Sequence, residues 1–168
     1  MKIFSRINFK EMPWSNGGGT TTELLRLEDP FVFRLSVAKV EQDGPFSLFP
    51  MIDRTLFLLS GTGFSLNDIV LDKKFSPLSF KGEMPIYCSL LNGPSQDFNV
   101  MIDRRWGKSH CQILNREADM TIHADHKLKY IFDYDSFQLW QIENNDQILF
   151  PENSRCPLIV VEVEVYAN

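Results

Sequence analysis

The chain has 168 residues, of which 43% are hydrophobic and 23% charged, and its formal net charge is −5. This composition is typical of a globular protein with one core or two small modules. The negative net charge argues against a nucleic acid as partner, because a surface that binds nucleic acid needs clustered Lys and Arg. No apolar stretch is long enough to cross a bilayer, so we expect no membrane contact, and the polar N-terminal segment and three widely spaced cysteines favour a reduced, cytoplasmic protein.

The first prominent feature along the chain is the segment PWSNGGGTTT at residues 13–22, with three consecutive glycines. Glycine adopts positive φ angles at little cost and lets a ligand approach the backbone closely, and successive N–H groups can bind an anion. Trp14 would add a flat wall, and Asn16 an amide that both donates and accepts. The alternative is a connection between strands with a tryptophan lid over the core.

The rest of the chain predicts short strands separated by turns and almost no helix. The expected strands cover residues 32–40, 55–60, 64–66, 69–71, 86–91, 97–104, 128–134, 137–143 and 158–166. Residues 67–68 and 135–136 are the expected turns of two hairpins. Fourteen phenylalanines and turn signals every 8–12 residues are typical of an all-β sandwich or barrel.

Period-two alternation places polar side chains on one face of two of these strands. Arg34 and Ser36 share a face of the first, and Asp97, Asn99, Met101 and Asp103 share a face of another. Such a face is either the wet outside of a sheet or the lining of a pocket in which a few polar groups orient a ligand.

Two arginines on or near these strands are candidate anion-binding groups. Arg34 and Arg54 carry guanidinium groups, which bind carboxylates in a two-pronged fork. The alternative is a structural ion pair, such as Arg54 with Asp53 or Asp97.

Metal and nucleophile chemistry have little support in the sequence. His123, Asp125 and His126 could supply two or three metal ligands on paper, but their surroundings are typical of a solvated polar turn. No Gly-x-Ser-x-Gly elbow is present, and Cys88 lies among apolar neighbours as a core residue would. We therefore expect no metal, no cofactor and no assignable catalytic residue.

Several motifs, in the same order, resemble those of the HutD/Ves family. Residues 13–20 resemble its PWxNGGG-T signature, and residues 80–83 resemble its F-x-G-[DE] turn. Further similar blocks are RLSVA at 34–38 with DGPFS at 43–47, FPMIDRTL at 49–56, and GP at 93–94 with DFNVM at 97–101. The likeness covers roughly residues 10–105.

The resemblance implies a cupin-type jelly-roll β-barrel in a cytoplasmic bacterial protein. It also implies a second, degenerate cupin-like module, so that residues 1–108 and 109–168 would form two modules packed as one compact unit. The histidine-containing pattern of metal-binding cupins is absent. Some members are associated with histidine utilisation, where regulation through a small carboxylate such as N-formylglutamate has been suggested, and others with stress responses; no enzymatic activity is established.

We therefore expect a metal-independent cupin that binds a small carboxylate metabolite and acts as a sensor or regulator. Trp14 would be the pocket wall, Asn16 and the glycine amides would orient the ligand, and Arg34 or Arg54 would bind its carboxylate. The expected ligand-binding residues are Trp14, Asn16, Gly17, Gly18, Gly19, Thr20, Arg34, Ser36, Asp53, Arg54, Asn99 and Met101.

Two other functions remain open. One is a cofactor-free isomerase, epimerase or hydrolase on the same barrel, for which Asp53, Asp97 or Asp103 would serve as general base. The other is a structural or interaction module whose aromatic surfaces form a homodimer or a contact with another partner.

Overall fold

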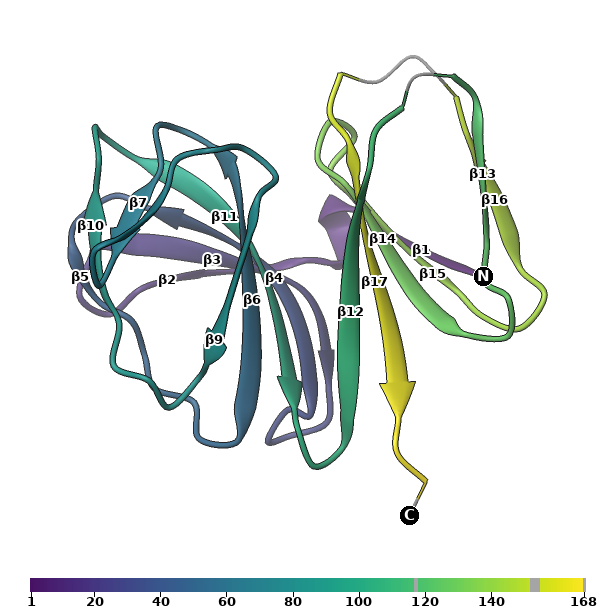
Figure 1. Ribbon diagram of the computed structural model, residues 1–168, viewed down its shortest axis with the longest axis horizontal. Coiled ribbons are helices and arrows are strands. Elements are labelled where there is room, and N and C mark those ends of the chain that lie inside the picture. Colours follow the sequence, from purple (N-terminus) through teal and green to yellow (C-terminus); the bar gives the residue numbers. More distant parts are fainter. Residues whose placement is uncertain (117, 152–154, 168) are drawn as a thin grey trace. The chain divides into compact units, whose positions relative to one another are not determined.

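The computed structural model describes residues 1–116, 118–151 and 155–167, and strands make up most of this part (Figure 1). The described residues contain no α-helix; the one helical element among them is a single 3₁₀ turn, η1 (Arg6–Asn8). The prediction of an all-β protein is confirmed. Within the described residues, no helix is long and apolar enough to cross a membrane.

The chain divides into two compact units. The larger unit is Phe9–Trp106, and the smaller unit combines Met1–Asn8 with Gly107–Asn168. The N-terminal residues join the smaller unit because β1 (Lys2–Phe4) pairs with β15 (Gln138–Ile142). The modules expected at residues 1–108 and 109–168, and the cupin-like nature of the second, stay a prediction.

The larger unit contains two antiparallel sheets. The six-stranded sheet has the order β2-β3-β4-β11-β6-β9, and the four-stranded sheet the order β5-β10-β7-β8. The first comprises β2 (Lys10–Pro13), β3 (Gly19–Leu27), β4 (Phe33–Val40), β11 (Ser95–Asp103), β6 (Ile52–Ser60) and β9 (Pro77–Lys81). The second comprises β5 (Gly44–Pro45), β10 (Tyr87–Leu90), β7 (Phe64–Leu66) and β8 (Ile69–Leu71).

The turn between β7 and β8 confirms the first predicted hairpin. Asn67 and Asp68 have φ angles of 45° and 70°. Positive φ angles at both central residues are typical of a type I′ turn, whose twist matches that of the two paired strands. Asn and Asp tolerate such φ angles better than most residues. Leu66 therefore pairs with Ile69 directly across the turn.

An apolar cluster packs the two sheets of the larger unit face to face. Val40, Leu56 and Leu58 come from the six-stranded sheet, and Phe64 and Cys88 are among those from the other. Their burial is the main favourable term for the packing of the two sheets. Closure of the two sheets into a cupin-type barrel stays a prediction.

The smaller unit contains a five-stranded sheet, β1-β15-β14-β17-β12, and a two-stranded sheet, β13-β16. Its remaining strands are β12 (Gly107–Leu114), β13 (Met120–His123), β14 (Leu128–Asp133), β16 (Gln147–Phe150) and β17 (Leu158–Val165). The pairing of β14 with β15 confirms the second predicted hairpin. β17 begins fully buried and ends exposed, as its change from continuous to alternating hydrophobicity indicates.

Candidate functional site

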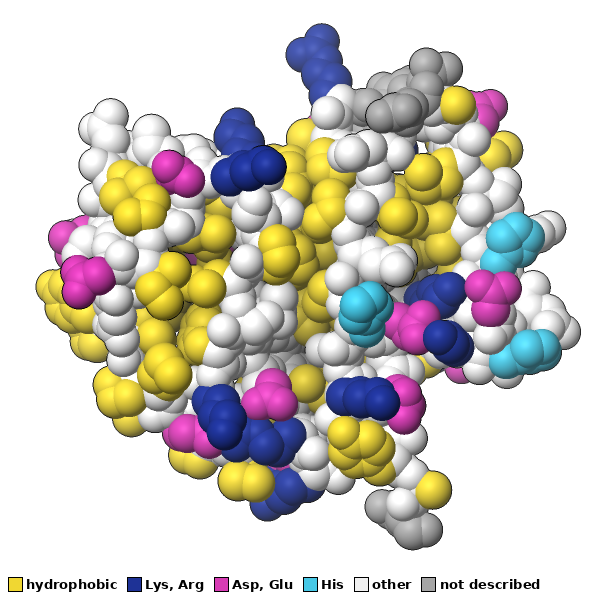
Figure 2. All heavy atoms as spheres, in the orientation of Figure 1, with side chains coloured by type: hydrophobic (Ala, Val, Ile, Leu, Met, Phe, Trp, Pro, Cys, Tyr) yellow, Lys and Arg dark blue, Asp and Glu magenta, His cyan; other side chains and the backbone are white. Residues whose placement is uncertain are grey.

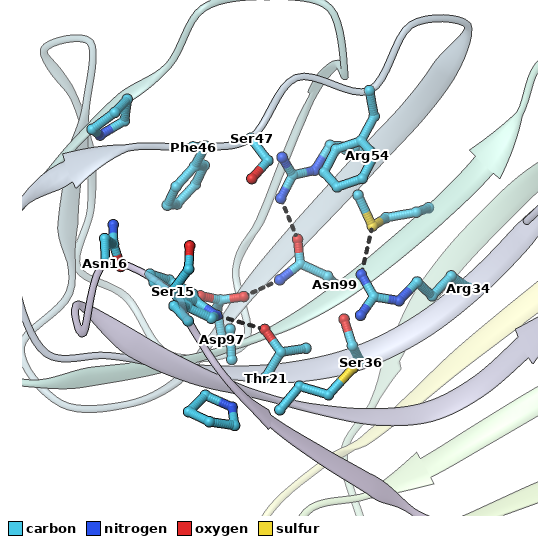
Figure 3. A pocket seen from close by; sticks show the side chains of 17 residues that line it. Ser15, Asn16, Thr21, Arg34, Ser36, Phe46, Ser47, Arg54, Asp97 and Asn99 are labelled. Carbon is cyan, nitrogen blue, oxygen red and sulfur yellow. Dashed lines mark hydrogen bonds between the residues drawn. The ribbon is translucent and has the colours of Figure 1, made fainter. Parts of the chain in front are cut away.

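A cavity of about 300 Å³ lies in the larger unit. One wall is polar and comes from neighbouring strands of the six-stranded sheet (Figure 3). The opposite side is formed by the segment around Trp14 and by Pro45, Phe46, Ser47 and Phe49. Trp14 and Phe46 also pack against the apolar cluster, so the cavity borders the core of this unit.

Strand register gathers the polar wall. In the six-stranded sheet, Met101 of β11 lies opposite Arg34 of β4 on one side and Arg54 of β6 on the other. In the next row, Asn99 lies opposite Ser36. Paired residues of antiparallel strands point to the same face, so both guanidinium groups enter one cavity.

Arg54 is the most constrained of these side chains. It is 8% exposed, and its Nη2 donates to Asn99 Oδ1 at 2.9 Å, whereas its buried Nε donates to no acceptor among the described residues. The guanidinium carbon lies 5.4, 5.6 and 5.0 Å from the ring centroids of Phe46, Phe49 and Phe80. Burial lowers the pKa of Arg54 to about 10 although the charge of Asp97 opposes this, so the side chain is still a cation at neutral pH.

Asp97 is linked to this arginine through the side-chain amide of Asn99. Asn99 Nδ2 donates to Asp97 Oδ1, while the oxygen of the same amide accepts from Arg54. Asp97 is 1% exposed, and this burial raises the pKa of its carboxyl group to about 7; the positive charge of Arg54 and the hydrogen bond from Asn99 act in the opposite direction. The carboxyl group therefore changes charge near neutral pH.

Arg34 differs from Arg54 because it already has a carboxylate partner. Its Nε donates to Glu23 Oε2 at 2.7 Å, and its Nη1 lies 4.0 Å from Met101 Sδ. By contrast, Arg54 forms no ion pair within 4.0 Å in the described part of the chain. Of the two predicted carboxylate-binding arginines, Arg54 has the greater unused hydrogen-bonding capacity.

The glycine segment holds Trp14 in place, and two of its three amides are used inside the loop. Gly17 N donates to Trp14 O at 3.0 Å, and Gly18 N donates to Asn16 Oδ1 at 2.9 Å. A Cβ atom on Gly19 would lie 2.4 Å from Lys39 O and 3.0 Å from the Trp14 ring. The indole Nε1 donates to Thr21 Oγ1 at 2.8 Å, which fixes the ring orientation.

The cavity brings together most of the predicted ligand-binding residues. Those that line it are Trp14, Asn16, Arg34, Ser36, Arg54, Asn99 and Met101. Those that do not are Gly17, Gly18, Gly19, Thr20 and Asp53. Whether any of them contacts a ligand stays a prediction.

The cavity also contains residues absent from the predicted set. Asp97, expected only as a general base of the enzymatic alternative, shares the alternating face of Asn99 and Met101, and Phe46 and Phe49 lie within the family motifs. Thr21 reaches the cavity because β3 begins at Gly19 and directs alternate residues inward, and this strand is not among those predicted from the sequence.

The other candidate carboxylates are held in ion pairs outside the cavity. Asp53 pairs with Arg104 at 2.8 Å, and Arg104 also holds Glu83 at 2.7 Å. Asp103 pairs with Arg105 at 2.5 Å, and this contact lowers the pKa of its carboxyl group. On the face shown in Figure 2, basic side chains lie beside acidic ones and form no single basic patch.

No group of three or more His, Cys, Asp or Glu side chains suited to a metal ion occurs in residues 1–116, 118–151 and 155–167. In the segment that contains His123 and His126, Asp125 lies 3.4 Å from Lys129 Nζ and its side chain is 71% exposed. The solvated-turn interpretation fits this arrangement.

Comparison with known proteins identifies relatives over most of the chain. A family model described as HutD matches residues 6–153. An uncharacterized 21.2 kDa protein in the hutC 3' region of Pseudomonas putida is 36% identical over 112 residues, which span 60% of this chain but only 57% of that protein. Protein Ves of Cronobacter sakazakii is 32% identical over 155 residues, covering 85% of this chain and 81% of the relative.

Two solved structures share the fold over 99% of each chain. A conserved protein of unknown function from Pseudomonas aeruginosa PAO1 superposes with a TM-score of 0.85 at 24% identity. HutD from Pseudomonas fluorescens SBW25, solved in a formate condition, superposes with a TM-score of 0.77 at 21% identity. At these identities the similarity establishes the fold alone.

Proposed function

The chain belongs to the HutD/Ves family, and from this premise we propose that its larger unit binds a small carboxylate-bearing metabolite through Arg54. The protein then acts as a metal-independent sensor or regulator rather than as an enzyme. A closed cupin-type barrel with a second, degenerate cupin-like module is the architecture proposed to carry this site.

The proposal is carried by Arg54 Nε, which meets no acceptor among the residues that the structure describes. A buried donor without an acceptor costs the free energy of its lost hydration, about 1–3 kcal/mol, and more when the group is charged. A carboxylate relieves this cost because its two oxygens accept parallel hydrogen bonds from one guanidinium group. The volume of about 300 Å³ is at the lower end of the range for ligand pockets, roughly 300–1,000 Å³, and suits a small metabolite.

The names of the relatives suggest the metabolic setting. One relative is described by its position beside hutC, and the structural neighbour from Pseudomonas fluorescens is called HutD. We therefore propose an acid of histidine utilisation, such as N-formylglutamate, as the natural ligand. Trp14 and Phe46 would contact its apolar carbons, and Ser36 and Asn99 its polar groups.

Calorimetric titration of the wild-type chain and of Arg54→Met with N-formyl-L-glutamate, L-glutamate and glutarate tests this function. Methionine keeps an unbranched, space-filling side chain but removes the fork of donors. Because hydrogen bonds to charged groups contribute about 1.5–3 kcal/mol, at least tenfold weaker binding is expected for every carboxylate that the wild type binds.

Arg26→Met is the matched control, since Arg26 is an exposed arginine of β3 outside the cavity. Its affinities should stay within twofold of the wild type. The proposal is abandoned if no carboxylate binds the wild type, or if Arg54→Met folds and binds as tightly as the wild type.

One observation supports the enzymatic alternative. Asp97 lines the cavity, and burial raises its pKa to about 7, a suitable value for a general base at neutral pH. Loss of a measurable turnover in an Asp97→Asn variant that still binds its ligand would favour this alternative.

The proposal also includes a cytoplasmic location and a homodimer. Measurement of the molecular mass in solution tests whether the chain forms the dimer.

A further inference from the structure

Two groups with opposite unused hydrogen-bonding capacity lie on the same cavity wall. Arg54 Nε is a buried donor that meets no acceptor among the described residues. Asp97 Oδ1 accepts from Asn99, and its second carboxyl oxygen receives no hydrogen bond from residues 1–116, 118–151 or 155–167. Both residues line the cavity, so its wall offers a ligand one donor and one acceptor.

Asn99 sets the spacing between these two groups. Its amide oxygen accepts from Arg54 and its amide nitrogen donates to Asp97 (Figure 3). The oxygen and nitrogen of an amide share one carbon, so the two partners lie one amide apart. A ligand that reaches both must carry its acceptor and its donor close together.

A simple carboxylate satisfies only half of this wall. It would pair with Arg54 but would bring a second negative charge close to the buried Asp97, and like charges in a poorly solvated site repel. A neighbouring N–H or O–H group on the ligand removes this conflict because it donates to Asp97.

We propose that Asp97 is a specificity-determining residue that selects carboxylates carrying an N–H or O–H donor next to the carboxylate. α-Amino acids, N-acyl amino acids and 2-hydroxy acids have this arrangement. The inference rests on the proposed function, since Arg54 must hold the carboxylate.

The charged and titratable groups around Asp97 come from several strands. Arg54 lies on β6, and Arg34 of β4 is paired with Glu23 of β3. Cys88 of β10 stays neutral because burial, with a contribution from Asp97, raises its pKa to about 12, and Asp43 Oδ1 accepts from the amide of Leu90. With Arg34 and Glu23 compensating each other, Asp97 dominates the pH dependence of binding near neutrality.

L-Glutamate and glutarate form a matched pair for the test, because they differ only in the α-amino group. Titration calorimetry of the wild-type chain at pH 8 should show at least tenfold tighter binding of L-glutamate. Because the pKa of Asp97 is about 7, glutamate affinity should fall by about tenfold between pH 8 and pH 6, while glutarate affinity should rise.

Asp97→Asn tests the residue itself, because asparagine has nearly the same shape but no charge. The preference for L-glutamate should drop below threefold and the pH dependence should disappear. Asp103→Asn is the matched control: Asp103 lies on the same strand but outside the cavity, and the preference should be unchanged.

The outcomes separate the two proposals. Equal or weaker binding of L-glutamate, still lost in Arg54→Met, overturns the role of Asp97 and leaves the carboxylate site intact. Absence of binding for both of these ligands and for N-formyl-L-glutamate overturns the carboxylate site and the inference with it. If Asp97→Asn does not fold, the ligand preference and the pH profile of the wild type decide.

Discussion

Arg54 and Asp97, the central residues of the proposed binding site, are buried at the expense of stability. Both are ionisable groups in a poorly solvated wall. Burial lowers the pKa of Arg54 and raises the pKa of Asp97, so in each case it favours the neutral form. Asn99 joins them by one hydrogen bond to each. Placing charges and orphaned donors in a site destabilises the unliganded protein, and a fitting ligand recovers that free energy.

At the residue scale, Asp97→Asn should stabilise the unliganded protein more at pH 8 than at pH 4. The folded-state pKa of Asp97 is about 7, whereas an unfolded Asp titrates near about 4, so the native state holds an extra proton between these values. Raising the pH removes that proton, and the wild type loses stability by an amount on the order of a few kcal/mol before levelling off above pH 8.

Urea unfolding of both proteins between pH 4 and pH 8.5 measures this difference. The free-energy gap between variant and wild type should widen with pH and then stay constant. A gap that narrows as the pH rises would show that Asp97 is stabilised, not destabilised, as an anion.

At the element scale, the site is a product of strand register and of one tight loop. β4, β11 and β6 bring Arg34, Met101 and Arg54 into one row, since each residue has a partner directly opposite. The loop between β2 and β3 closes through Trp14 N, which donates to Gly19 O at 2.9 Å. The glycines thus shape the wall that Trp14 forms.

Gly19→Ala should therefore destabilise the protein by about 1–3 kcal/mol, the usual cost of forcing extra atoms into packed space. The added methyl group would meet Lys39 O at 2.4 Å and the Trp14 ring at 3.0 Å, and the backbone oxygen cannot move without disturbing β4. Denaturant unfolding measures the loss, and tryptophan fluorescence should report a changed environment of the indole.

Gly44→Ala is the control for this experiment, because a Cβ atom there meets nothing within 4 Å. It should change stability little. Equal effects of the two substitutions would mean that the contact between Gly19 and Trp14 is not what the loop requires.

At the scale of the whole molecule, the cavity is lined by residues of the larger unit only. The smaller unit has its own buried ion pair, in which Arg116 Nη2 lies 2.7 Å from Asp133 Oδ1 and the side chains are 3% and 7% exposed. Loss of this ion pair should therefore lower stability without weakening ligand binding.

Arg116→Met should lower the free energy of unfolding by about 3–5 kcal/mol, because it leaves the Asp133 carboxylate buried without its partner. Ligand affinity below the melting temperature should stay within twofold of the wild type. Lys108→Met removes an exposed pair with Glu164 in the same unit and should leave both quantities nearly unchanged. A large loss of affinity in Arg116→Met would contradict the confinement of the site to the larger unit.

The sequence by itself determined the β class, the two hairpins and which polar residues share a face. These are local properties: Asn67 and Asp68 accept positive φ angles, and alternation along residues 97–101 places Asp97, Asn99 and Met101 on one side. The family motifs at residues 13–20 and 49–56 also indicated Trp14 and Arg54 as candidate site residues.

Only the tertiary structure decided which of these groups remain available to a ligand. Arg34 is paired with Glu23, and Asp53 is paired with Arg104. Among the described residues, Arg54 and Asp97 keep unused hydrogen-bonding capacity on either side of Asn99. The glycine amides, expected to face a ligand, are partly used within their own loop. Such pairings depend on strand register and burial, which join residues far apart in the chain and which no local pattern specifies.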